Sequence, residues 1–375
     1  MKITHVEVWT VPVPAPSPSF TWRAGLPGSG PEGTRGILRI GTDDGASGVA
    51  FASRPGSATV LRDLVDRVWR DELVGQDPLQ REHLYHRMWE LDRIEEFALP
   101  YLGTVDLALW DLAARAAGQP LWQLLGGART RIPAYASTTT FDTTEEFLTV
   151  ADRALEQGYR AIKLHAWGDA RRDAALCRAL REHVGPDVPL MYDGSAGFDL
   201  PDAIYLGHAL TDADYLWYEE PMREFSVSAY SALGRAVRVP LLSAETSDGS
   251  YMNSADFVSA GAPTFGLRIS SELRGGISGA MRTAHLADAF RLRAEPHGMG
   301  EPERHLCMAV SNATYYESLV TSTEFVRTEG IDIDGHLLAP VGPGVSLPRT
   351  LDYPPALAAY VNPDPVALTG HDSAR

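Results

Sequence analysis

The chain has 375 residues, which is too long for one small core, so two domains are expected. Its composition, 44% hydrophobic and 22% charged, is that of a globular protein, and the formal charge of −16 argues against nucleic acid or an anionic membrane as a partner. Cys177 and Cys307 give neither a disulfide framework nor a thiolate metal site, and the sequence shows no secretion signal or long apolar run, so a cytoplasmic location is predicted.

The first part of the chain predicts an α+β domain over residues 1–125. Residues 1–12 and 36–52 alternate in the manner of antiparallel strands, and 58–125 carries apolar residues at helical spacing. The segment between the strands, at about residues 14–36, is rich in proline, glycine and serine and should be a surface loop. A loop of this length inside a compact domain is usually functional or disordered.

Strand and helix patterns alternate over residues 126–330. Eight strands and seven helices in this order favour a parallel barrel, a modified TIM barrel of the (β/α)7β type, over an open doubly wound sheet. The expected strands cover residues 132–137, 161–166, 188–193, 215–219, 240–245, 264–269, 291–296 and 316–320. The last segment, 331–375, contains short extended pieces and is expected to return to the first domain.

Three acidic residues close three consecutive predicted strands. Asp193 in PLMYDGS, Glu219 in YLWYEEP and Glu245 in PLLSAET follow one another at intervals of 26 residues, about the length of one strand–helix unit. Because the C-terminal ends of barrel strands meet at one rim, these carboxylates should repel each other unless a cation joins them. Oxygen ligands suit a hard divalent ion, and we predict one Mg²⁺ per subunit. The alternative is that these acids cap helices or pair with arginines.

A lysine and a histidine lie two residues apart on the strand before Asp193. Strand alternation places Lys163 and His165 on one side, facing the barrel interior, where they would make a pair that handles protons. Alternatively, Lys163 pairs with one of the carboxylates and His165 bonds a backbone carbonyl. Inward charges in a barrel are costly without a task, which favours the catalytic interpretation.

Three further residues are candidates for the site because of their positions on the predicted strands. His297 ends the seventh strand and would face the metal site from the far side of the rim. Glu317 on the eighth strand could bond a substrate oxygen, although glutamate also suits an exposed turn. Arg268 ends the sixth strand and could either bind a substrate carboxylate or bridge Glu245.

A metal held by three acids and flanked by bases suits one reaction class. A carboxylate substrate binds the metal, its α-proton is removed, and the metal stabilises the resulting enediolate. Return of a proton gives epimerisation, whereas loss of a β-hydroxyl gives dehydration. The predicted partner is therefore a small-molecule carboxylate.

Several motifs together resemble the enolase superfamily, specifically its mandelate racemase-like group. They are MKITHVEVW, TVDLALWDLAARAAGQPLWQLLGG, GYRAIKLHAWGD, MYDGSAGF, WYEEP, SAET and RGGISGAMRTAHLA, which span nearly the whole chain. The resemblance implies an N-terminal capping domain, a (β/α)7β barrel and Mg²⁺ on Asp193, Glu219 and Glu245. It selects Glu219 over Glu220 because the first acid of WYEEP is the family's ligand.

The resemblance also implies roles for the other site residues. Lys163 and His165 fall on the family's two-base K-x-K site, His297 on the base of strand seven, and Glu317 on the acid that polarises the substrate. Residues Phe20–Gly33 fall on a lid that helps to choose the substrate.

Two departures from the family pattern bear on the reaction. The second lysine of K-x-K is His165, and the aspartate that normally supports the strand-seven histidine is missing from Arg268-Ile269-Ser270-Ser271. Without it, His297 should have a lower pKa and act as a general acid or hydrogen-bond donor. This tilts the prediction from racemisation to dehydration.

The sequence therefore predicts a Mg²⁺-dependent lyase that dehydrates a sugar acid, an aldonate or an aldarate. The alternatives are a racemase, epimerase or cycloisomerase of a hydroxy or amino acid, a metal-binding scaffold without turnover, and a barrel hydrolase. Substrate contacts are expected from Trp22, Arg23, Trp167 and Arg268. We also expect a homo-oligomer.

Overall fold

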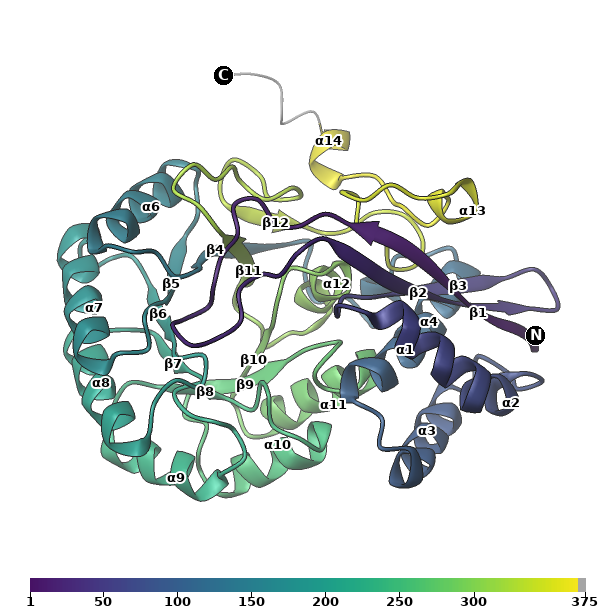
Figure 1. Cartoon of the computed structure of the whole chain (residues 1–375), viewed down its shortest axis with the longest axis horizontal. Helices are drawn as coiled ribbons and strands as arrows, with labels where there is room; N and C mark the ends of the chain where they lie inside the picture. The colour runs from purple at the N-terminus through teal and green to yellow at the C-terminus, as the bar shows by residue number, and fades with distance from the viewer. Residues whose placement is uncertain (370–375) are drawn as a thin grey trace.

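The computed structural model describes residues 1–369 and shows an N-terminal α+β domain beside a parallel barrel (Figure 1). The first strands form one antiparallel sheet in the order β1-β2-β3: β1 (Ile3–Val13), β2 (Gly33–Thr42) and β3 (Ser47–Ala52). The following helices are α1 (Ser57–Leu64), the π-helical turn η1 (Val65–Trp69), α2 (Arg70–Leu73), α3 (Arg81–Glu95), α4 (Leu99–Ala116) and α5 (Leu121–Leu124).

Within the described residues, eight parallel strands alternate with seven helices. The strands are β4 (Arg131–Thr138), β5 (Ala161–His165), β6 (Leu190–Asp193), β7 (Trp217–Glu219), β8 (Leu241–Ser243), β9 (Gly266–Ile269), β10 (Arg293–Pro296) and β11 (Tyr316–Val320). The helices are α6 (Thr144–Glu156), α7 (Ala170–Val184), α8 (Leu200–Asp212), α9 (Val227–Ala236), α10 (Ser250–Ser259), α11 (Gly276–Ala289) and α12 (Glu301–Ala309). The predicted modified TIM barrel with an α+β N-terminal domain is confirmed.

The barrel strands are buried on both faces, as expected of a parallel sheet covered by helices. The helices lie outside the strands (Figure 1), and their apolar sides share one core with the outward strand residues. Inside the barrel, Tyr135, Met191, Trp217 and Leu242 pack into a separate apolar floor. The Trp217 indole donates to Glu219 Oε2 at 3.0 Å, so this floor supports one of the predicted metal ligands directly.

A side chain replaces backbone pairing between the last two strands. The parallel ladder runs from β10 through β4 to β11, and the described residues show no ladder between β10 and β11. Instead, the buried carboxylate of Glu295 accepts hydrogen bonds from the Thr314 and Tyr315 amides, at 3.1–3.2 Å, and from the Thr314 hydroxyl at 2.6 Å. Burial raises the pKa of Glu295. The carboxylate thus satisfies strand-edge donors that a neighbouring strand would otherwise pair.

The N-terminal domain contacts the barrel through α4 and α11. Asp106 on α4 accepts from the amide of Ser278 at 2.9 Å and from its hydroxyl at 2.6 Å. Gly276 begins α11 with a φ of +87°, and a Cβ there would lie 2.3 Å from Asp106 Oδ2. Only glycine allows this approach, which fixes how the two domains meet.

The C-terminal segment contains β12 (His336–Leu338), α13 (Pro355–Ala358) and α14 (Pro365–Thr369). β12 pairs with β4 in antiparallel fashion, and Leu347, Leu357 and Tyr360 pack against the β1-β2-β3 sheet. Buried Asp111 accepts from the amides of Val49 at 2.8 Å and Val345 at 2.6 Å. This segment is therefore joined to the N-terminal domain as well as to the barrel.

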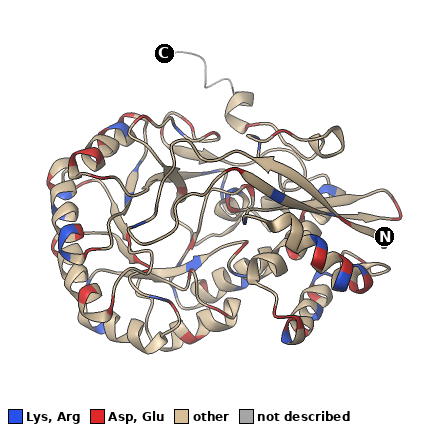
Figure 2. Ribbon diagram, viewed as in Figure 1, with Lys and Arg blue, Asp and Glu red and all other residues tan. Residues whose placement is uncertain are grey.

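Charges of both signs are distributed over the outer helices of the barrel and the helices of the N-terminal domain (Figure 2). Among residues 1–369, no helix combines the length and apolar character needed to cross a membrane.

We predict that replacing Asp106 changes how stability depends on pH. Burial raises the pKa of Asp106 to about 6, from an ordinary value of 3.8. The folded protein binds this proton more tightly than the unfolded chain, so the stability it contributes at low pH is lost as the pH rises through about 6. Asp106→Asn should therefore gain about 2 kcal/mol relative to the parent between about pH 4 and pH 7. Urea unfolding at both pH values measures this, with the exposed Asp288→Asn variant as control. The prediction is wrong if the difference in unfolding free energy between Asp106→Asn and the parent is the same at both pH values.

Candidate active site

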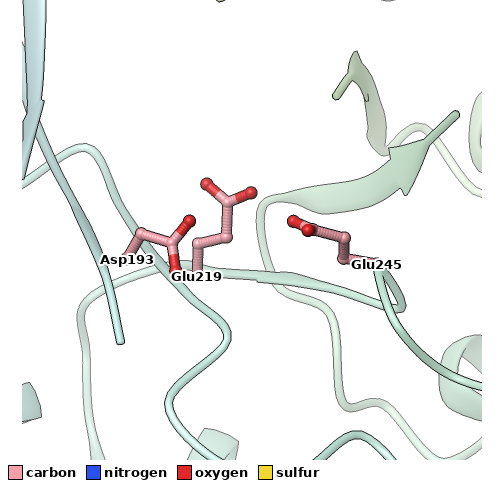
Figure 3. A group of neighbouring side chains, drawn as sticks. All are labelled: Asp193, Glu219 and Glu245. Carbon is pink, nitrogen blue, oxygen red and sulfur yellow. The ribbon is translucent and has the colours of Figure 1, made fainter. Parts of the chain in front are cut away.

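The three predicted metal ligands meet at the C-terminal rim of the barrel. Asp193 ends β6, Glu219 ends β7, and Glu245 lies two residues beyond β8. One carboxylate oxygen from each lies within 4.8 Å of the others, and all three side chains are buried. Figure 3 shows the carboxylates of Asp193 and Glu245 directed inward on either side of Glu219.

The backbone beyond these acids is strained. Left-handed φ values occur at Ser195 (43°) and Ala196 (54°) after Asp193, at Glu220 (40°) after Glu219, and at Ala244 (71°) before Glu245. Non-glycine residues adopt this conformation at a cost, and it clusters at functional sites. These left-handed residues lie next to the three acids, where the chain leaves or approaches the barrel rim.

Two buried groups hold the turn that carries Glu245. Glu224 accepts from the amides of Ala244 at 2.5 Å and Thr246 at 2.6 Å, while Arg274 donates to the carbonyl of Glu245 at 2.7 Å. Burial raises the pKa of Glu224 to about 7. The sequence reasoning did not single out either residue, because their value lies in contacts with a neighbouring loop.

Two buried cations lie among the acids. Lys163 Nζ lies 3.1 Å from Asp193, 3.0 Å from Glu219 and 2.9 Å from Glu317. Arg268 Nε donates to Glu219, and its Nη2 donates to Glu317 at 2.8 Å. Only 1% of either side chain is exposed, so these ion pairs are formed away from water.

Arg268 also reaches the neighbouring strand. Its Nη1 donates to the carbonyl of Pro296 at 2.7 Å, directly before His297, and its Nε lies 3.7 Å from Glu245. Of the two roles considered for Arg268, the bridge toward Glu245 corresponds to a long contact within this network. The substrate contact stays a prediction, and the side chain lies outside the lining of the open cavity.

The ion pairs shift several pKa values in opposite directions. Burial opposes ionisation of Glu317, but Lys163 and Arg268 outweigh it and hold the pKa well below its ordinary value. Burial would also lower the pKa of Lys163, yet Glu219 and Glu317 raise it well above the ordinary range. For Glu245, burial and the neighbouring acids raise the pKa well above its ordinary value. The charge of Glu245 is thus less well balanced by neighbouring cations than that of Glu317.

The site satisfies a direct test of whether it fits a cation. Glu245 Oε2 is buried and accepts no hydrogen bond, while it faces two other carboxylates. An unsatisfied buried carboxylate oxygen is costly, and a divalent ion among the three acids would satisfy it. The group offers three carboxylate oxygens, which are the hard donors that Mg²⁺ prefers, and it contains no thiolate or imidazole.

His165 lies beside Asp193 and under the lid. Its Nδ1 donates to the carbonyl of Thr138 at 2.6 Å, and its Nε2 lies 3.0 Å from Asp193 Oδ2. A carbonyl and a carboxylate only accept, so Nδ1 donates to Thr138 and Nε2 donates to Asp193 in this arrangement, and Nε2 is the nitrogen whose proton can be exchanged. The ring of Trp22 lies against His165, with centroids 4.9 Å apart.

His297 approaches the acids from the β10 side. Its Nε2 lies 3.1 Å from Glu245 Oε1, while His165 is next to Asp193, so the two histidines contact different acids of the group. Removal from water lowers the pKa of His297 to about 4, although 35% of its side chain is exposed. This direction agrees with the sequence prediction, but its largest cause is burial.

A cavity of about 560 Å³ opens above the acids. Lys163, His165, His297, Glu317, Trp22 and Arg23 line it, as do two of the metal-site acids, Asp193 and Glu245. Trp167, a predicted substrate contact, is outside this lining; its indole donates to the carbonyl of Phe141 at 2.7 Å. A smaller cavity of about 130 Å³ between the domains contains none of these catalytic candidates.

Two lining arginines were missed by the sequence reasoning. Arg223 follows β7 by four residues, and Arg54 lies in the loop after β3 of the N-terminal domain. Arg223 could have been predicted to line the site, because it is a cation that closely follows a strand ending in a predicted metal ligand. No such signal existed for Arg54, which reaches the cavity only because the two domains are in contact.

The loop between β1 and β2 lies over the cavity as a lid (Figure 1). Arg23 Nε donates to the carbonyl of Ser195 at 2.9 Å, directly beyond Asp193 and Gly194. The amide of Thr140 donates to the carbonyl of Thr21 at 3.0 Å, and that of Ala24 donates to the carbonyl of Trp167 at 3.3 Å. The lid is therefore docked on several barrel loops.

Comparison with known proteins agrees with this geometry. Residues 146–349 match the model described as enolase C-terminal domain-like, and residues 28–126 match the mandelate racemase / muconate lactonizing enzyme N-terminal domain. The chain belongs to the enolase superfamily, in its mandelate racemase group. The matched ranges correspond to the barrel and to the capping domain, with part of the lid.

Alignments with related proteins extend over most of the length of this member of the mandelate racemase group. It is 31% identical to a 3,6-anhydro-alpha-L-galactonate cycloisomerase of Streptomyces coelicolor, over 82% of this chain and 86% of that one. It is 31% identical to a D-glucarate dehydratase from Agrobacterium tumefaciens crystallised with magnesium (TM-score 0.81; 92% and 95% covered). An L-talarate dehydratase from Polaromonas sp. JS666, complexed with Mg and L-glucarate, is 25% identical (TM-score 0.77; 96% and 98% covered). The predicted magnesium cofactor is confirmed by these magnesium-bound neighbours together with the buried acid group.

We predict that Arg268 stabilises the folded protein through its buried ion pairs. Arg268→Met would leave Glu219 and Glu317 with fewer buried partners, at an expected cost of about 3–5 kcal/mol in the free energy of unfolding. Added Mg²⁺ should stabilise this variant more than the parent, because the cation offsets the uncovered charge. Urea unfolding with and without Mg²⁺ measures both effects. Exposed Arg178→Met is the control, and equal losses in the two variants would contradict the prediction.

We also predict that Arg23 keeps the lid docked. Arg23→Ala removes the donor to Ser195, so amides of residues 14–32 should exchange with deuterium faster than in the parent. Mass spectrometry of the exchanged peptides measures this. Arg35→Ala, on β2 outside the cavity lining, serves as the control, and unchanged exchange in the lid of Arg23→Ala would show that other contacts suffice.

Proposed function

We propose that this protein is a Mg²⁺-dependent dehydratase of a sugar acid, an aldonate or an aldarate, that works through α-proton abstraction and an enediolate. The observation that carries the proposal is the placement of His165 and His297 against different acids of one buried three-carboxylate group. Relatives named as dehydratases and cycloisomerases of sugar acids support the same substrate class.

The chain's own groups divide the proton transfers between them. When bound by Asp193, Glu219 and Glu245, Mg²⁺ would supply positive charge beside the substrate carboxylate and so make the α-proton more acidic. His165 takes that proton on Nε2 from the form in which Nε2 no longer donates to Asp193, while the Thr138 carbonyl keeps the remaining ring proton on Nδ1. Lys163, engaged by three carboxylates, offsets negative charge rather than acting as the base.

The second half of the reaction removes water. The bond between the β-carbon and its hydroxyl breaks, and His297 gives the departing oxygen the proton that its Nε2 shares with Glu245 Oε1, 3.1 Å away. The electron pair left by the α-proton forms the new double bond, and the resulting enol rearranges to a 2-keto-3-deoxy acid. Glu317 bonds a substrate oxygen from the cavity wall, where Gly298 holds its other oxygen at 2.8 Å.

Isomerisation is the second candidate. One of the two 31% identical relatives is named as a cycloisomerase, and a pair of histidines beside different acids could also return the proton to the same carbon. A racemase, epimerase or cycloisomerase of a hydroxy or amino acid would share the enediolate and lose no water.

Measuring exchange of the α-proton distinguishes the role of His165 from that of His297, and dehydration from isomerisation. A panel of sugar acids is incubated with enzyme and Mg²⁺ in D₂O, and NMR follows deuterium at the α-carbon and 2-keto acid product. The parent should form the 2-keto acid, and a chelator should stop it. His297→Asn should lose about 10²–10⁴-fold in product while still exchanging the α-proton, whereas His165→Asn should lose both.

Exposed His285→Asn is the matched control and should behave as the parent. Exchange without loss of water in the parent would favour isomerisation. Failure of every sugar acid, with turnover of an amino-acid derivative, would overturn the proposed substrate class.

A further inference from the structure

The cavity lining carries two arginines, Arg54 and Arg223, in addition to the cations that pair with the predicted metal ligands. Arg223 lies in the β7–α9 loop of the barrel, and Arg54 lies beyond β3 in the capping domain. Neither forms an ion pair with Asp193, Glu245 or Glu317 within the described residues. They place positive charge in the same cavity as the acids, contributed by two different domains.

These two guanidinium groups form fewer hydrogen bonds and ion pairs than the other cations that line the cavity. Among residues 1–369, Arg223 is exposed and has no hydrogen-bond or ion-pair partner. The side chain of Arg54 is 50% exposed, and its one ion pair is a long contact of 3.8 Å with Glu272. By contrast, Lys163 is held by three carboxylates, and Arg23 donates to backbone carbonyls.

The arrangement suits a ligand that brings a negative charge of its own. Arginine is the preferred partner of carboxylates because its planar fork donates two parallel hydrogen bonds. In a chain with a formal charge of −16, a second anion would otherwise be repelled from an acid-lined cavity. A neutral end of a substrate would make little use of two guanidinium groups, whereas a carboxylate would pair with them.

We infer that Arg54 and Arg223 form a subsite for the distal carboxylate of a dicarboxylic substrate. This inference rests on the proposed function and narrows it to aldarates, sugar acids with a carboxylate at each end. One carboxylate faces the magnesium site and the other pairs with the two arginines. The relatives do not decide this point, since they are named for a galactonate derivative as well as for glucarate. Because Arg54 belongs to the capping domain, the substrate would also bridge the two domains.

The test uses substrates that differ only at the distal end. Glucarate is compared with gluconate, and galactarate with galactonate, in the full-length enzyme with Mg²⁺. We expect kcat/KM to favour the dicarboxylate, and Arg223→Gln and Arg54→Gln each to lower the ratio of dicarboxylate to monocarboxylate about tenfold or more. The change should lie mainly in KM, and Arg223→Lys, which keeps the charge but loses the fork, should lie between.

Exposed Arg238→Gln, outside the cavity, is the charge-matched control and should keep the parent ratio. The inference is overturned if the parent shows no preference, or if the arginine variants and Arg238→Gln change the ratio alike.

Calorimetric binding separates this inference from the proposed function. If glucarate binds in an Arg223-dependent manner and gluconate binds more weakly, but neither loses water, the result supports the carboxylate subsite and contradicts the proposed dehydration. If both acids are dehydrated equally and the variants keep that ratio, dehydration stands and the subsite falls. If no acid of the sugar-acid panel binds with Mg²⁺ present, both are overturned.

Discussion

Three predicted metal ligands and Glu317 share the C-terminal mouth of one barrel, and the mutual repulsion of their carboxylates is the constraint on which the site depends. Lys163 and Arg268 reduce that repulsion from within, each contacting Glu317 and at least one of the three acids. The balance is incomplete, because an oxygen of Glu245 has no donor. The protein therefore holds its acids close together and leaves the remaining charge for a bound divalent cation.

Each structural region contributes a different part of this site. The barrel supplies the three acids and the candidate proton-transfer groups, and residues with left-handed φ values lie next to the acids at the rim. The capping domain supplies Arg54 and the lid, whose Arg23 is bonded to the loop beyond Asp193. Contacts such as that of Asp106 with Ser278 fix the two domains together. Residues of both domains thus meet at one cavity.

Much of the barrel and its metal group could be predicted because both depend on local patterns. Strand alternation and a 26-residue repeat placed Asp193, Glu219 and Glu245 at equivalent points, and the closed sheet brings equivalent points together. Alternation also placed Lys163 and His165 on one inward face. The contacts considered as alternatives, from the lysine to carboxylates and from the histidine to a backbone carbonyl, are present as well. They position these side chains in the cavity.

The sequence by itself determined the order of elements, the acids at the strand ends and the identity of the metal they suit, since each depends on residue type and spacing. Only the tertiary structure decided which distant groups meet. Examples are Glu295 joining the last two strands, Arg268 lying among the acids, and Arg54 reaching the cavity while Trp167 lies outside its lining. These depend on how the barrel closes and how the capping domain rests on it, which no local period records.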